Sequence, residues 1–307
     1  MRIASLDIGT NTFRILICES KGKQLRTLYI NRVITRLGGG FTKGGKIITE
    51  EAIERSIRVL KEFSRNLEKY KVERVRAIAT SVVRESLNGD EFIKRAKDET
   101  GMAIEVISGD EEARLTVEGA LQSISIDTGY KVIFDIGGGS TEYSFIDNNE
   151  IIEIVSTQLG VVHLTEKYLH NDIPSDSSIK KLTKHIENTI TSRLLTKIKY
   201  KDEKLSLIAT AGTPTTLAAI EMDLEKYNAD LVNGFILKKE MLTRIFEKLI
   251  SIPMNQRLKV KGLEKGREDV IIPGILIMLK TMERFLKDEV VVSDGGILEG
   301  TVSSIIT

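Results

Sequence analysis

The sequence predicts an α/β protein that contains the same domain twice. Short apolar strands alternate along the chain with helices whose apolar residues recur every three or four positions. A strand that leads into Asp-Ile-Gly and hydroxyl residues occurs at Asp7 and again at Asp135. A second motif, Ile-Ala-Thr, ends at Thr80 and at Thr210, in the same order and at nearly the same offset. Two different motifs that repeat at one spacing indicate a duplicated domain.

The composition is typical of a globular protein and excludes several classes of partner. Hydrophobic residues make up 41% and charged residues 29% of 307 residues, enough for two cores. The net charge of +1 provides no basic surface for nucleic acid. No apolar run reaches the roughly 18–20 residues of a membrane span, and no signal-peptide core precedes the first strand. With Cys18 as the single cysteine, we expect a cytoplasmic protein without nucleic-acid or membrane partners.

The first domain is expected over residues 1–124, with a return of the chain at 295–307. Its strands are expected at residues 3–8, 13–19, 25–30, 75–80 and 104–107. Thr49 is the expected N-cap of a long helix, because acidic residues and then an apolar stripe follow it. Further helices are expected over Asp90–Thr100 and from Gly109, where three acidic residues favour a helix start.

The second domain is expected over residues 125–294, after a polar stretch at 123–129. Its strands are expected at residues 132–136, 142–147, 150–157, 205–210 and 290–292. Its helices are expected from Val162, from Asp176, after Ala211, and over 238–251 and 267–287. The order of strands and helices therefore repeats that of the first domain.

The glycine turn after Asp135 is a candidate phosphate site. Residues 137–139 carry no side chains that would keep an anion from their N–H groups, and Ser140 adds a hydroxyl. Asp135 and Glu142 flank the turn, where carboxylates could hold a cation that accompanies the phosphate. The alternative is an ordinary glycine hairpin between two strands. The repetition of the motif at Asp7 favours the phosphate site.

Two arginines and a pair of glutamates allow two interpretations each. Arg14 and Arg84 follow strand ends, where they would clamp a phosphate or simply be solvated. Glu111 and Glu112 open a helix, and the helix dipole alone favours acids there. A general base for water is the other interpretation, which the spacing alone does not favour. The P-loop, the dinucleotide-binding glycine motif and the G-x-S-x-G elbow are all absent.

These motifs resemble those of a known family. The segments Asp7–Arg14 and Asp135–Glu142 resemble the phosphate loops of the actin, sugar-kinase and heat-shock ATPase superfamily. That resemblance implies duplicated ribonuclease-H-like domains, with mixed sheets flanked by helices and the active site in the interdomain cleft. Within the superfamily, the chain resembles the exopolyphosphatase/guanosine pentaphosphate phosphohydrolase (Ppx/GppA) family. Over essentially the whole chain, the matching segments are Arg36–Gly40, Ala79–Asn88, Ile107–Arg114, Gly212–Ala219 and Gly262–Gly274.

The resemblance implies hydrolysis of a terminal phosphate from inorganic polyphosphate or of the 5′-phosphate from pppGpp. Glu112 matches the glutamate that activates water, and Glu142 a second catalytic acid. Asp135 and its counterpart Asp7 match acids that hold Mg²⁺, and the family also allows Mn²⁺ and a monovalent cation such as K⁺. The residues expected to bind phosphate are Thr10, Asn11, Arg14, Arg84, Gly137, Gly138, Gly139, Ser140, Gly212 and Thr213. Expected partners are polyphosphate or guanosine penta- or tetraphosphate, and a homodimer is allowed.

The resemblance has one clear departure and leaves two alternatives. Leu298 stands where the family has an arginine, within Gly295–Gly300, and a leucine cannot make the polar contacts of that arginine. The chain resembles the short, two-domain members. One alternative is an ATP-dependent kinase of the same superfamily, which would need an adenosine pocket. The other is a non-enzymatic sensor of (p)ppGpp or polyphosphate, for which a water-activating Glu112 would have no use.

Overall fold

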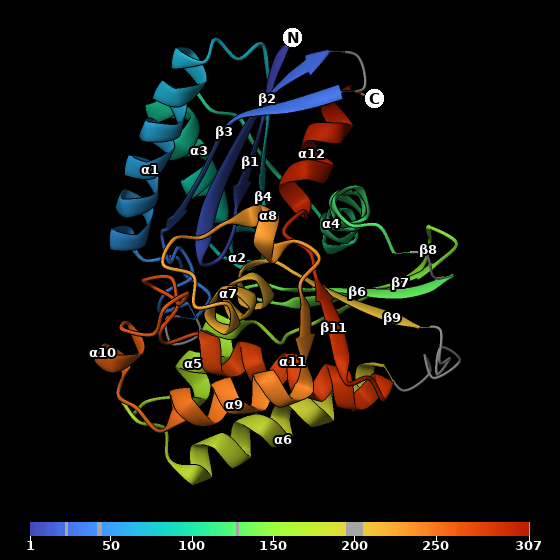
Figure 1. The fold of residues 1–307 in the computed structure, drawn as a ribbon. Coiled ribbons are helices and arrows are strands. Elements are labelled where there is room, and N and C mark those ends of the chain that lie inside the picture. The colour runs from blue at the N-terminus through green and yellow to red at the C-terminus, as the bar shows by residue number, and fades with distance from the viewer. Residues whose placement is uncertain (22–23, 42–44, 127–128, 195–204, 307) are drawn as a thin grey trace. The chain divides into compact units, whose positions relative to one another are not determined.

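The chain folds into two compact units, described here from a computed structural model that covers residues 1–306 except 22–23, 42–44, 127–128 and 195–204 (Figure 1). The first unit comprises Met1–Gly119 and Gly296–Thr307, and the second comprises Ala120–Gly295. Sequence analysis placed the first change of domain after residue 124, in a polar linker. Helix α4 (Gly109–Ser123) instead continues across the change of unit, so no loop marks it.

The first unit is built on a mixed five-stranded sheet with the order β3-β2-β1-β4-β5. The strands are β1 (Arg2–Ile8), β2 (Thr12–Lys21), β3 (Gln24–Ile34), β4 (Arg74–Ala79) and β5 (Ile104–Val106). β1, β2 and β3 are antiparallel, whereas β4 runs parallel to β1 and β5 parallel to β4. The carboxyl ends of β1, β4 and β5 therefore meet at one edge of the sheet.

Successive side chains of the central strands point to opposite faces of the sheet, and both faces are apolar. Its helices are α1 (Glu50–Lys69), α2 (Ser81–Glu85), α3 (Gly89–Thr100), α4 and α12 (Ile297–Ile306). Leu6 and Ile8 of β1 face the core that α1 covers, whereas Ile3 packs with Leu298 and Val302 of α12 on the other face (Figure 1). Leu298, the departure from the family motif, is thus a buried core residue. It packs beside the buried Cys18, whose thiol pKa burial raises to about 11.

Helix α1 shows why these segments are helical. Thr49 accepts a hydrogen bond from the N–H of Ala52, and Glu50 and Glu51 occupy the first turn, where the helix dipole favours acids. Its buried residues recur at helical spacing and face the sheet. The N-cap and the stripe predicted from the sequence are both confirmed.

The second unit repeats this topology with one strand added. Its six-stranded sheet has the order β10-β11-β9-β6-β7-β8. The strands are β6 (Tyr130–Ile136), β7 (Thr141–Asp147), β8 (Glu150–Thr157), β9 (Ser206–Thr210), β10 (Ile236–Lys238) and β11 (Glu289–Val292). β6, β7 and β8 are antiparallel, and β9 and β11 run parallel to β6, as β4 and β5 do to β1. Sequence analysis missed β10, a three-residue strand too short for a visible alternation.

The second unit's helices pack around one apolar helix. They are α5 (Val161–Tyr168), α6 (Asp176–Arg193), α7 (Gly212–Glu221), α8 (Ala229–Val232), α9 (Lys239–Ile250), α10 (Met254–Arg257) and α11 (Ile271–Phe285). α11 is buried along nearly its whole length and contacts α5, α6, α7 and α9. The predicted α/β fold with two mixed sheets is therefore confirmed. None of the helices in the described ranges has the length and apolar character needed to cross a membrane.

Candidate functional site

The predicted residues of the first unit gather at the edge where its parallel strands end. Ile8 of β1 lies beside Ala79 of β4, which in turn lies beside Val106 of β5. The segments that follow these residues carry Thr10 and Asn11, then Arg84, then Glu112. Ligands of α/β sheets bind outside such carboxyl ends. One sheet edge thus assembles residues that lie far apart in the sequence.

Backbone hydrogen bonds fix the β1–β2 turn at residues 9–12. The Gly9 N–H donates to the Thr12 carbonyl at 3.2 Å. The Thr10 and Asn11 carbonyls accept hydrogen bonds from the N–H groups of the segment 35–38. Because a trans peptide points its C=O and the following N–H in opposite directions, the N–H groups of Asn11 and Thr12 face away from that segment. The turn is therefore fixed with two amides directed outward.

The Asn11 side chain is the clearest sign of a ligand in this turn. It is 6% exposed, and among the described residues neither its amide nitrogen nor its amide oxygen has a hydrogen-bond partner. A buried amide without partners is costly by about 1–3 kcal/mol, which a bound ligand or water would offset. Thr10 behaves differently, since its methyl group packs against Gly38.

Asp7 and Arg14 face each other across β1 and β2. The Arg14 guanidinium donates to Asp7 Oδ2 from Nε at 2.8 Å, and its second nitrogen lies 2.7 Å from the same oxygen. Asp7 is buried and Arg14 is partly exposed. Sequence analysis assigned Asp7 to a metal and Arg14 to phosphate. The structure brings the two side chains together as an ion pair.

Arg84 and Glu112 form the second ion pair of this edge. Arg84 Nη1 lies 3.1 Å from Glu112 Oε2 and also donates to the Ile107 carbonyl at 2.9 Å. The Glu112 side chain is 14% exposed. The neighbouring Glu111 is more exposed and pairs with Arg76. The structure thus separates two adjacent glutamates that spacing alone could not distinguish, and it places Glu112 beside a predicted phosphate-binding arginine.

In the second unit, the β6–β7 turn at residues 137–140 repeats the first turn. The Gly137 N–H donates to the Ser140 carbonyl at 2.9 Å, and the Gly137 and Gly138 carbonyls accept from the first two amides of α5 at 3.0 and 2.9 Å. The N–H groups of Gly138 and Gly139 consequently face away from α5. Gly160 packs directly on this turn, with no room for a Cβ. Of the three predicted glycine amides, two point outward and the amide of Gly137 is used within the turn.

Two carboxylates stand opposite each other beside this turn. Asp135 and Glu142 are paired residues of β6 and β7, so their side chains lie on the same face of the sheet. Glu142 is 3% exposed, and Ser156 of β8 donates to its Oε1 at 2.8 Å. Sequence analysis did not identify Ser156. The positive φ angles of Asn148 and Asn149 mark the hairpin turn between β7 and β8. Pairing residues at equal distances on either side of that turn would have placed Ser156 near Glu142.

The N-terminus of α7 lies at the same edge, because Thr210 of β9 pairs with Asp135 of β6. The Thr213 side chain packs against Gly274 of α11. At Gly212, a Cβ would lie 2.1 Å from Nη1 of Arg267. Arg267 is 8% exposed and its Nε donates to Glu264 at 2.8 Å. No local motif links Arg267 to Gly212, so sequence spacing gave it no role.

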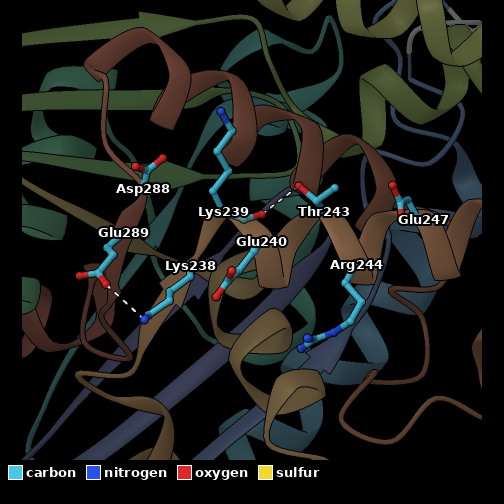
Figure 2. A pocket seen from close by; sticks show the side chains of 8 residues that line it. All are labelled: Lys238, Lys239, Glu240, Thr243, Arg244, Glu247, Asp288 and Glu289. Atoms are coloured by element: carbon cyan, nitrogen blue, oxygen red, sulfur yellow. Dashed lines mark hydrogen bonds and ion pairs between the residues drawn. The ribbon is translucent and has the colours of Figure 1, made fainter.

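A hollow of about 690 Å³ lies elsewhere in this unit (Figure 2). Its lining includes Asp288 and Glu289, at the start of β11, whereas the predicted residues follow the ends of the strands parallel to it. Cations and acids alternate around it, and Lys238 pairs with Glu289 at 3.7 Å (Figure 2). This hollow is therefore at the opposite edge of the sheet from the candidate site.

Comparisons with known proteins give one consistent result. The Ppx/GppA phosphatase family model matches residues 16–307. Exopolyphosphatase 2 of Mycobacterium tuberculosis is 30% identical, over 99% of this chain and 98% of that protein. A bifunctional 3-dehydroquinate synthase/phosphatase of Fusobacterium nucleatum is 34% identical over 97% of this chain, which spans 46% of that protein's length. Among solved structures, the Aquifex aeolicus PPX-GPPA enzyme superposes with a TM-score of 0.81 at 35% identity, with 99% of each chain covered.

Proposed function

Because this chain belongs to the Ppx/GppA phosphatase family, we propose that it hydrolyses the terminal phosphoanhydride of inorganic polyphosphate, the 5′-phosphate of pppGpp, or both. The observation that carries the proposal is the Glu112 carboxylate, shielded from solvent and held by Arg84 at the strand edge. A protein that only binds phosphates has no use for such a base. The exopolyphosphatase named among the relatives supports polyphosphate as the substrate class.

In this mechanism Glu112 removes a proton from the attacking water. The water oxygen bonds to the terminal phosphorus while the bond to the bridging oxygen breaks. The shortened chain leaves with the bridging oxygen and its electron pair, and orthophosphate is released. Such a displacement requires neutralised phosphate oxygens and an oriented water more than covalent chemistry. Each unit by itself offers groups for that purpose: the Arg84 and Arg14 guanidiniums and the Asn11 amide in the first, and the N–H groups of Gly138 and Gly139 in the second.

The residues present fit a divalent cation beside the second turn. The opposed carboxylates of Asp135 and Glu142 offer hard oxygen ligands on one face of the sheet. Mg²⁺ is commonly held by one or two carboxylates, with waters and substrate phosphates completing its shell. Within the described ranges, no group of three or more His, Cys, Asp or Glu side chains is assembled. We propose that Asp135 and Glu142 would hold this cation, which when bound would balance charge on the phosphates.

The test is phosphate release, with Mg²⁺, from short polyphosphate, long polyphosphate and pppGpp in parallel. Glu112→Gln is expected to lower kcat by about 100- to 10,000-fold, the usual contribution of a general base. Glu111→Gln is the matched control, because that neighbouring glutamate pairs with Arg76 instead, and it should leave kcat nearly unchanged. Calorimetric titration with short polyphosphate should show similar affinity for all three proteins.

The outcomes separate the competing functions. Release that is lost only in Glu112→Gln supports the hydrolase, and the ranking of substrates identifies the physiological class. Equal activity of Glu112→Gln and wild type would contradict the assignment of the base. Tight (p)ppGpp binding without release from any substrate would indicate a sensor, and phosphate transfer from ATP to an acceptor would indicate a kinase.

A further inference from the structure

A cationic segment of the second unit has no role in the proposed chemistry. It comprises residues 259–267, between α10 and α11, and contains Lys259, Lys261, Lys265 and Arg267 against the single acid Glu264. The three lysines are exposed. A charge run on a surface is usually no more than a solvated face, so its meaning depends on where the fold places it.

The fold places this segment along α7. At one end, Arg267 lies against Gly212, the first residue of α7. At the other end, Gly262 packs against the backbone of Ala219, where a Cβ would lie 2.3 Å from the carbonyl oxygen. Gly262 also has φ +81°, so close approach and backbone conformation both require glycine there. With a rise of about 1.5 Å per residue, the two contact points are about 10 Å apart along the helix.

The outer end of the segment opens on a hollow of about 540 Å³. Lys248 of α9 joins Lys259 and Lys261 in its lining, against Asp223 as the one acid. Gln256, Ile252 and Val260 complete the wall. Lys261 also lies 3.2 Å from Glu225, in a pair whose side chains are both mostly exposed. Such an exposed pair contributes little, so an anion could replace the carboxylate at small cost.

The hollow of Figure 2 serves as the contrast within the same unit. Four acids and three cations line it, namely Glu240, Glu247, Asp288 and Glu289 against Lys238, Lys239 and Arg244. A polyanion would be repelled there as much as attracted. The hollow beside the cationic segment has the opposite balance.

We propose that the cationic segment binds the distal phosphates of a long polyphosphate chain, an inference that rests on the proposed function. The terminal phosphate would lie near the outward amides of the second turn and the α7 N-terminus. The rest of the chain would follow the exposed side of the cationic segment where it covers α7, from Arg267 at the inner end to Lys259, Lys261 and Lys248 at the outer end. A short chain reaches only the inner end. Long polyphosphate therefore gains affinity that tripolyphosphate and pppGpp do not.

The test is a Lys259→Gln/Lys261→Gln double variant, assayed on tripolyphosphate and on long polyphosphate. Its KM for long polyphosphate should rise about three- to tenfold, the size of two exposed charge contacts, with kcat unchanged. Both parameters for tripolyphosphate should stay at wild-type values. The KM for long polyphosphate should also become less sensitive to KCl, because fewer counterions are released on binding. Lys180→Gln/Lys181→Gln, on the exposed face of α6, is the matched control and should change nothing.

Three results would overturn the inference. An unchanged KM for long polyphosphate, in a variant that melts as wild type does, would leave the hydrolase intact and remove the distal site. An equal rise in KM for both substrates would show that the lysines act at the terminal phosphate or through general charge. A wild-type protein that releases phosphate from neither substrate would remove the proposed function, and this inference with it.

Discussion

The two strand turns of the duplicated domains share one scaffold but differ in charge. In each turn a glycine N–H donates to the carbonyl three residues later, and two further carbonyls accept hydrogen bonds from a neighbouring segment. Two amide N–H groups of each turn therefore point away from that segment. Beside the first turn, Asp7 faces Arg14, whereas beside the second, Asp135 faces Glu142. Like charges directly opposite each other on a sheet are destabilising. The first turn therefore has an ion pair beside it, whereas the second has two acids opposite each other, where we propose that the cation binds.

The segments after the parallel strands differ in the same sense. After β4, Thr80 leads into α2, a helix of five residues that carries Arg84. After β9, Ala211 leads into α7, a helix of ten residues with glycine at its first position. A helix of that length presents free N–H groups and a dipole to an anion. The first unit thus presents a cationic side chain after its parallel strand, and the second presents the backbone N–H groups of a helix N-terminus.

The largest expected effect comes from replacing the two aspartates, Asp135 and Asp7, one at a time by asparagine. Asp135→Asn should raise the Mg²⁺ concentration for half-maximal activity by at least about 10- to 100-fold, because a direct ligand is lost. Asp7→Asn should leave that concentration nearly unchanged and instead lower stability by about 1.5–3 kcal/mol, because a charged hydrogen bond to Arg14 is weakened. Mn²⁺ binding followed by electron paramagnetic resonance, together with thermal unfolding, measures both. Equal shifts in metal dependence would show that the two halves share the cation.

A smaller effect is expected from the arginine that holds the base. Arg84→Ala should lower kcat by about 10- to 100-fold, because Glu112 loses the contact that fixes its carboxylate. Arg84→Lys should recover part of this loss, since it keeps the charge without the planar fork. Arg76→Ala breaks the neighbouring pair with Glu111 and is the matched control. If Arg84→Ala raises only KM, then Arg84 binds ground-state phosphate and does not position the base.

The sequence predicted what is local and missed what depends on tertiary contact. The two turns, the N-cap at Thr49 and the stripe of α1 are visible because they depend on residues within a few positions of one another. The contact of Arg267 with Gly212 and the hydrogen bond from Ser156 to Glu142 join separate elements, so spacing could not show them. The hydrogen bond of the Gly137 N–H within its own turn could not be predicted for a different reason. A glycine run shows that amides are accessible but not which way each one points.

The smallest expected effect concerns Ala211, the residue before α7. A glycine at this position and a glycine before α2 of the first unit should change stability in opposite directions. Ala211 has φ 74° and ψ −165°, a region that is nearly exclusive to glycine and costs about 1–3 kcal/mol for other residues. Ala211→Gly should therefore raise the stability of the second unit by about 1 kcal/mol, once the added freedom of the unfolded chain is subtracted. Thr80, the residue before α2 in the first unit, has φ −113°, so Thr80→Gly should lower stability by about 0.5–1 kcal/mol or more. Urea unfolding of both variants measures the two signs. A loss of stability in Ala211→Gly would show that this backbone is unstrained. A gain in stability with unchanged kcat/KM would mean that the N–H groups of α7 keep their direction without a side chain at residue 211.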